Sequence, residues 1–159
     1  MKKLSLAILM LGLSAVVNAA GYGVIDLEKV VESSQYLKQQ NASLEASIKP
    51  QASKLEQLNK ELATLQKQSQ TQGANLKQIE TQYQAKMTEF TTLQQSIQSR
   101  VQTTIQNTNK TFEARVKQAA EQLRQENSLD LVLNKNAALA FDSKYDLTAK
   151  MIQKVNAIK

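Results

Sequence analysis

Cysteine, histidine and tryptophan are absent from this chain of 159 residues. Without cysteine, no disulfide can stabilise the fold and no thiol can act as a nucleophile. Without histidine, the chain lacks the common general base at neutral pH and a common zinc ligand. Carboxylates remain, but pairs such as Glu56 and Glu61 fall on a solvated helix face, where we expect nothing to shift their pKa values toward catalytic use. The sequence therefore predicts no enzyme, no cofactor and no metal site.

Glycine and proline are also scarce, with four glycines and one proline in the chain. Gly73 is the only glycine after residue 23, and it follows the polar run from Ser69 to Gln72. Glycine readily adopts the left-handed conformation in which many helices end. We therefore expect the chain to reverse direction near residue 72.

Apolar residues on both sides of this turn recur every three, four or seven positions, which places them on one face of a helix. In the first segment they are Leu44, Ile48, Leu55, Leu58, Leu62 and Leu65. In the second they are Leu76, Ile79, Tyr83, Met87, Phe90, Leu93, Ile97, Val101, Ile105, Phe112, Val116, Ala119 and Leu123. At 1.5 Å per residue, two helices between Ser34 and Asn127 would reach roughly 55 and 80 Å. The pattern predicts a long antiparallel helical hairpin.

The one proline, Pro50, lies inside the first helical stripe. It cannot donate a hydrogen bond to the carbonyl of Ala46 and it crowds that carbonyl, so we expect the helix to kink or break just before residue 50. Pro50 would then be either a mobile hinge or a fixed bend set by packing. The sequence leaves both possibilities open.

The first nineteen residues have the pattern of a secretory signal peptide. A basic start, Lys2-Lys3, precedes an apolar run from Leu4 to Val17, and small residues follow up to Ala19. The run is about fourteen residues, shorter than the roughly twenty that a membrane span needs, which disfavours an uncleaved anchor. We expect cleavage after Ala19 and a soluble periplasmic protein.

The charge is positive but modest. Without Lys2 and Lys3, 18 basic residues stand against 14 acidic residues, a net charge of +4. Between residues 51 and 94 the charges nearly balance, with five lysines and four glutamates. Such a molecule would approach an anionic membrane surface only weakly, because salt screens exposed charges beyond about 8 to 10 Å. A small excess without a basic run argues against nucleic acid as a partner.

The two ends of the chain carry short strand patterns and one more helix. We expect strands near 23–27, 130–134 and 138–141, the last two joined by the turn Asn134-Lys135-Asn136. A final helix over 147–158 would be capped by Asp146. The fold predicted is α+β, mostly α, with a helical arm over 50–94 whose tip lies near 70–74. Residues 20–49 and 95–159 would form a discontinuous body.

The short strands of this body lead us to predict that the chain associates with copies of itself. Strands of about five residues are marginal alone, and their open edges pair readily with other chains. We expect a small cyclic homo-oligomer built through residues 20–34 and 110–159. Its candidate contacts are Val24, Ile25, Leu131, Leu133, Leu139 and Phe141.

The terminal blocks resemble those of a known family. The segments Gly23 to Ser34, Leu129 to Ala137 and Tyr145 to Thr148 closely resemble the Skp/OmpH family of periplasmic chaperones. The resemblance implies a homotrimer with a small β-containing body and three helical arms around a cavity. It further implies an ATP-independent holdase that receives unfolded outer-membrane β-barrel proteins before their insertion. Some members have basic arms and a lipopolysaccharide site, which we do not transfer to these nearly neutral arms, so lipopolysaccharide contact stays open.

A thin two-helix seam covers its apolar residues only partly, so their flanks remain available to a client. The candidate client contacts are Leu55, Leu58, Leu62, Leu65, Leu76, Ile79, Tyr83, Met87, Phe90 and Leu93. The same residues would also hold the hairpin together. The alternative function is a structural coiled-coil spacer of the cell envelope, although such proteins usually keep stricter heptads than this drifting stripe.

Overall fold

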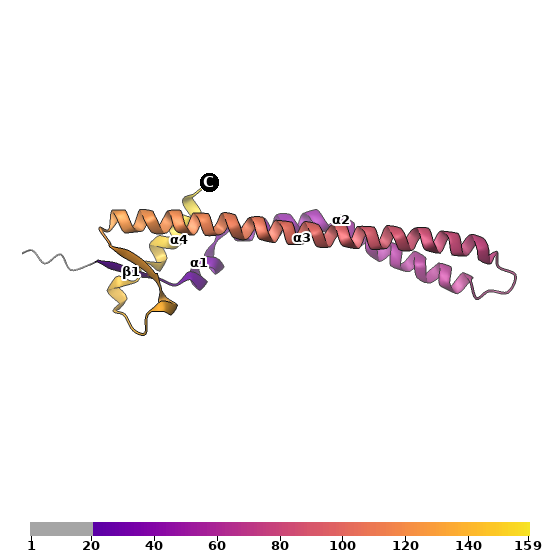
Figure 1. Ribbon diagram of the computed structural model, residues 1–159, viewed down its shortest axis with the longest axis horizontal. Helices are drawn as coiled ribbons and strands as arrows, with labels where there is room; N and C mark the ends of the chain where they lie inside the picture. Colours follow the sequence, from indigo (N-terminus) through magenta and orange to yellow (C-terminus); the bar gives the residue numbers. More distant parts are fainter. Residues whose placement is uncertain (1–20) are drawn as a thin grey trace, which may run out of the picture.

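A helical hairpin projects from a small mixed body in the computed structural model, which describes residues 21–159 (Figure 1). The predicted signal peptide, residues 1–19, lies outside the described residues. In chain order the elements are β1 (Tyr22–Ile25), α1 (Leu27–Ser33), α2 (Gln35–Gln68), α3 (Leu76–Glu126), β2 (Leu131–Asn134), the 3-10 turns η1 (Lys135–Ala137) and η2 (Ser143–Tyr145), and α4 (Thr148–Ala157). The α+β, mostly helical fold predicted from the sequence is confirmed.

The hairpin consists of α2 and α3, and polar caps define where each helix begins. The Ser34 hydroxyl accepts a hydrogen bond from the backbone N–H of Leu37 at the start of α2. The Asn75 side chain does the same for Gln78 at the start of α3. Between the helices Gly73 has a φ of +84°, a conformation that glycine adopts without strain. The chain reverses in the short turn that contains this glycine.

Pro50 does not interrupt α2, so of the kink or break that we expected there, the break is wrong and the kink stays a prediction. The helix runs from Gln35 to Gln68 with Pro50 inside it. A proline in a helix interior removes one hydrogen bond and costs about 3 kcal/mol. Packing against α3 offsets this cost, because Leu58 and Leu62, about two and three turns beyond the proline, are buried. Whether Pro50 acts as a hinge stays a prediction.

The sheet is a parallel pair, β1 and β2, with Tyr22 opposite Leu131 and Val24 opposite Leu133. The whole hairpin serves as the connection between them, because parallel strands need a long crossover. The hairpin is thus an insertion into a two-stranded sheet. The strands expected near 23–27 and 130–134 are present with slightly different ends.

The third strand, expected near 138–141, is wrong. Asn134 does not start a β-turn into a returning strand; its side chain instead caps a 3-10 turn by accepting from the N–H of Asn136. The chain then loops below the sheet and returns beside the free edge of β1 (Figure 1). There Asp146 bridges Val24, and the N–H of Leu147 donates to the Val24 carbonyl at 2.8 Å. This later segment occupies the second edge of β1, whereas the edge of β2 that the third strand was expected to cover has no strand beside it within residues 21–159.

The core of the body lies where β1 meets α1, the second half of α3 and α4. Its buried members are Ile25, Val30, Phe112, Ala119, Leu123, Met151 and Val155. Helix α4 begins one residue later than expected, and its N-cap residue is Leu147 rather than Asp146. The Asp146 carboxylate, one residue earlier, still accepts from the N–H of Thr148 at 2.8 Å, the first residue of the helix. The side-chain and backbone hydrogen bonds from Thr148 lower the pKa of Asp146. The ends of the hairpin are therefore anchored in a packed body.

Candidate functional site

The outer part of the hairpin carries all ten residues predicted from the sequence as client contacts. Three of them on α2, Leu58, Leu62 and Leu65, are buried against α3 and hold the two helices together. The half-buried ones are Leu55, Ile79, Tyr83, Met87, Phe90 and Leu93. Leu76 is 59% exposed. The ten residues thus divide into a dry seam and a flank that still meets solvent.

Two ion pairs cross the seam on its solvent side. Lys86 Nζ lies 2.6 Å from a carboxylate oxygen of Glu61, and Lys54 Nζ lies 3.3 Å from Glu89. Contact with Lys86, followed by a hydrogen bond from Gln57, lowers the pKa of Glu61. This lowering of the Glu61 pKa is away from the range of a general base, so it does not contradict the expectation that nothing shifts this carboxylate toward catalytic use. These pairs align the two helices and add little stability, because exposed ion pairs are weak.

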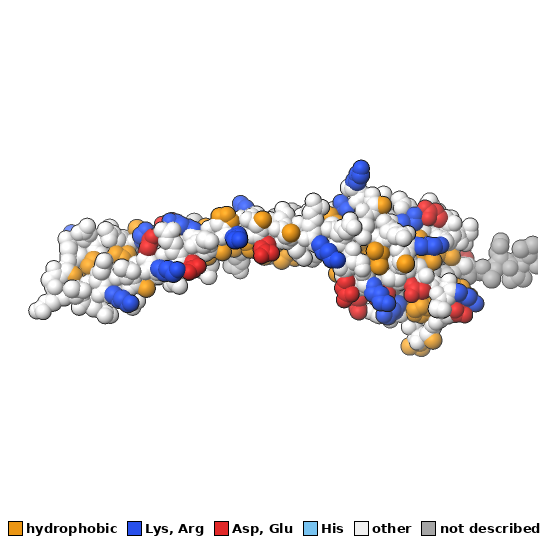
Figure 2. Space-filling view, turned by 180° about the vertical axis from the view of Figure 1, so that it is seen from behind, with side chains coloured by type: hydrophobic (Ala, Val, Ile, Leu, Met, Phe, Trp, Pro, Cys, Tyr) orange, Lys and Arg blue, Asp and Glu red, His pale blue; other side chains and the backbone are white. Residues whose placement is uncertain are grey.

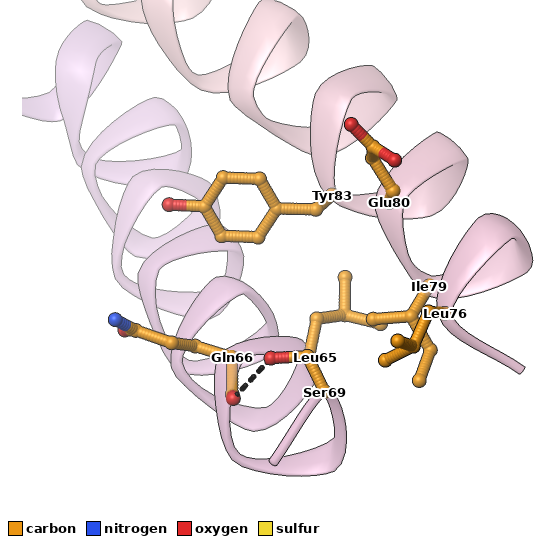
Figure 3. A pocket seen from close by; sticks show the side chains of 7 residues that line it. All are labelled: Leu65, Gln66, Ser69, Leu76, Ile79, Glu80 and Tyr83. Atoms are coloured by element: carbon orange, nitrogen blue, oxygen red, sulfur yellow. Dashed lines mark hydrogen bonds between the residues drawn. The ribbon is translucent and has the colours of Figure 1, made fainter. Parts of the chain in front are cut away.

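A groove lies at the tip of the hairpin, where α2 ends and α3 begins (Figure 3). It has a volume of about 310 Å³, and its apolar wall consists of Leu65, Leu76, Ile79 and Tyr83. Gln66, Ser69 and Glu80 complete its lining. Sequence reasoning had identified the four apolar residues but not the three polar ones. Nothing in the pattern marks those three, because they join the groove only through the angle between the helices at the turn.

At the root of the arm, α2 and α3 are held together less tightly. Leu37, Leu44 and Thr104 line a space of about 180 Å³ between the helices, and Ile105 beside it is 48% exposed. Figure 2 shows apolar side chains along the arm in a broken row, interrupted by charged groups of both signs. The apolar surface of the arm is therefore distributed along its length.

The six predicted association residues fall into two groups. Val24 and Ile25 are 1% and 6% exposed, because the rest of the body covers them. Leu131 and Leu133 on β2 remain 42% and 37% exposed, and Leu139 in the following loop is fully exposed. Phe141 is half-buried. Within residues 21–159, β2 pairs only with β1, so its outer edge and three leucines are available to a partner.

Groups suited to chemistry are not gathered in the described part of the chain. Residues 21–159 contain no cluster of three or more acidic, histidine or cysteine side chains that would hold a metal ion. Among the same residues, no helix is both long and apolar enough to cross a membrane. What the described residues offer is contact surface.

The fold and this surface define a structural class: a long helical hairpin, with an apolar flank, carried by a small α+β body. The chain belongs to the family of OmpH-like outer membrane proteins, whose model matches residues 21–155. The resemblance noted from the terminal blocks is thereby confirmed.

A solved structure has the same fold. The crystal structure of a candidate outer membrane chaperone (OmpH-like) from Caulobacter crescentus CB15 superposes with a TM-score of 0.72. The two sequences are 21% identical, and the match covers 87% of this chain and 85% of that chain. At this identity the likeness concerns the fold. No curated protein matches the chain by sequence.

Proposed function

We propose that this protein is an ATP-independent periplasmic holdase, which binds unfolded outer-membrane β-barrel proteins and prevents their aggregation. The observation that carries this proposal is the half-exposed apolar flank on the arm, from Leu55 to Leu93, in a member of the OmpH-like family. The likeness to a candidate outer membrane chaperone supports it. The client is held by contact and undergoes no chemical step.

The grip of the arm is the sum of many weak contacts. Each partly exposed side chain on the flank offers a few tens of Å², worth on the order of 1 kcal/mol at about 25 cal/mol per Å². Several such contacts retain an unfolded chain, yet each of them breaks easily. A client that must later insert into a membrane therefore leaves without an energy source. The nearly balanced charge of the arm agrees with apolar rather than electrostatic capture.

The binding space requires more than one arm, so the proposal includes a homotrimer whose arms enclose a cavity. The outer edge of β2 and the exposed Leu131, Leu133 and Leu139 support association through the body. Unpaired strand edges and exposed leucines are the features that a subunit interface usually covers. In this arrangement residues 1–19 direct export and are removed.

Light scattering tests the proposal directly. An unfolded outer-membrane barrel protein is diluted from denaturant, with and without this protein lacking residues 1–19. We expect suppressed aggregation at one trimer per client, without ATP. A double variant Met87→Gln, Leu93→Gln is expected to suppress aggregation less, because both residues lie on the flank. Thr88→Gln with Ser96→Gln, exposed positions on the same helix, is the matched control.

Unchanged aggregation in the presence of stoichiometric trimer would overturn the holdase proposal. That result would favour the alternative, a structural spacer of the cell envelope, which needs the long arm but no client surface.

A further inference from the structure

The groove at the tip of the hairpin differs from the rest of the seam in its shape (Figure 3). Along the seam, leucines of α2 pack directly against α3. At the tip, next to the turn between Gln68 and Leu76, a space opens between the side chains of the two helices. Leu65, only 7% exposed, is the floor of the groove, and the far more exposed Leu76 stands at its mouth. The result is an open apolar hollow at the end of the arm.

One of the three polar side chains around the hollow, Ser69, is hydrogen-bonded within the arm. The Ser69 hydroxyl donates to the carbonyl of Gln66 at 2.8 Å, the bond drawn in Figure 3. The main chain on both sides is helical, so it presents no strand edge to which an extended peptide could add. An occupant would therefore be recognised through a side chain rather than through its backbone.

One carboxylate sets the charge of the site. Of the seven described residues that line the groove, Glu80 alone is charged. The other three glutamates of the arm, Glu56, Glu61 and Glu89, pair with lysines, whereas Glu80 forms no ion pair within the described residues. The rim of the groove is therefore negative and suited to a cationic group.

We propose that this groove binds one bulky apolar side chain, aromatic or large aliphatic, of an unfolded polypeptide, with a neighbouring lysine or arginine placed against Glu80. A volume of about 310 Å³ is at the small end of ligand pockets, which suits a side chain and not a folded partner. The inference rests on the proposed holdase function and assigns to it a specific contact at the arm tip.

The absence of tryptophan and cysteine from the sequence makes a clean binding assay feasible. Gln72→Cys, in the exposed turn beside the groove, provides a single site for a fluorophore that tryptophan quenches. The probe is a short unstructured peptide with one tryptophan between two lysines. Comparison peptides replace the tryptophan by alanine, or both lysines by glutamate.

We expect quenching by the tryptophan–lysine peptide and weaker binding of both comparison peptides. Leu76→Ser, at the mouth, is expected to weaken binding roughly tenfold, because it removes apolar area from the contact. Glu80→Gln should weaken it about threefold at low salt and not at high salt. Ile105→Ser is the matched control, since it changes a similarly exposed residue of α3 far from the tip.

Equal loss in Leu76→Ser and Ile105→Ser, or equal binding of all three peptides, would overturn the inference. So would quenching by the peptide that appears only when the labelled protein is diluted, because the groove would then be occupied by a second copy of the chain. The light-scattering assay is run on the same variants. If all of them still suppress aggregation while the tip binds no peptide, the inference fails and the holdase function stands; if the wild type suppresses nothing, the proposed function fails.

Discussion

Asp26 connects four parts of the body through one residue that is only 6% exposed. Its carboxylate caps α1 by accepting from the N–H of Lys29, and it accepts from Lys135 Nζ at 2.6 Å. Its own N–H donates to the hydroxyl of Thr148 at the start of α4, at 2.9 Å. Asp26 therefore ties β1 and α1 to α4 and to the turn after β2.

This residue gives the stability of the body a defined pH dependence. The hydrogen bond from Lys135 lowers the pKa of Asp26 in the folded protein. A carboxyl group with a lowered folded pKa adds stability above its unfolded pKa, about 4, and that stability is lost as the pH falls through the folded value. Glu121, whose pKa Arg124 lowers to about 2, contributes with the same sign.

We predict that Asp26→Asn, which can keep the cap but loses the ion pair, lowers Tm at pH 7 by about 4 °C. The difference in Tm between this variant and the wild type should stay constant down to about pH 5 and shrink below about pH 4. Thermal unfolding followed by circular dichroism at several pH values measures this. Asp142→Asn, which removes an exposed carboxylate near Lys144, is the control. A difference in Tm that grows toward acid pH would contradict a stabilising ion pair at Asp26.

At the scale of elements, the arm is unevenly held. Its tip half has the buried Leu58, Leu62 and Leu65 and two ion pairs across the seam. Toward the root, the facing residues Leu44 and Ile48 are half-buried, and Pro50 lies between the two regions. The missing hydrogen bond at Pro50 thus falls at the boundary between the buried contacts of the tip half and the half-buried contacts of the root.

We predict that Pro50→Ala stabilises this part of α2, because alanine is favoured over proline in a helix interior by about 3 kcal/mol. Amide hydrogen exchange between residues 46 and 54 should slow by at least about tenfold, while exchange near the tip stays the same. Ser53→Ala, an exposed change on the same helix, should have little effect. Unchanged exchange in Pro50→Ala would exclude a hinge at this position.

At the scale of the whole molecule, the body of a single chain leaves one strand edge and three leucines exposed. β2 has one neighbour within the described residues, and Leu131, Leu133 and Leu139 face solvent. An arm of α2 and α3 alone forms no enclosure. These two features are the reason why we propose an assembly.

We predict that Leu133→Asp reduces the native mass, measured by sedimentation, from an oligomer toward the monomer, because a carboxylate would be buried without a partner at the interface. Leu76→Ser, at the far end of the arm, should leave the mass unchanged. A wild-type protein that sediments as a stable monomer at micromolar concentration would contradict the association that we propose.

Much of the fold follows from local sequence patterns. The apolar stripes, Gly73 and the polar caps are local signals, so the hairpin and its turn are predictable. The two strands were found for the same reason. The absence of a strand near 138–141 could not be predicted from the sequence, because an apolar run of that length is compatible with a strand or a loop. In the structure the Asn134 side chain caps a 3-10 turn over Lys135–Ala137, and this turn leads the chain away from β2.

The sequence by itself determined a long helical hairpin between short strands, since periodicity of three and four residues is a property of the chain alone. Only the tertiary structure decided which apolar residues are buried. Leu65 and Leu76 belong to equivalent stripes, yet one is the floor of the tip groove and the other stands exposed at its mouth. That difference depends on where the turn separates the two helices, and neither stripe encodes it.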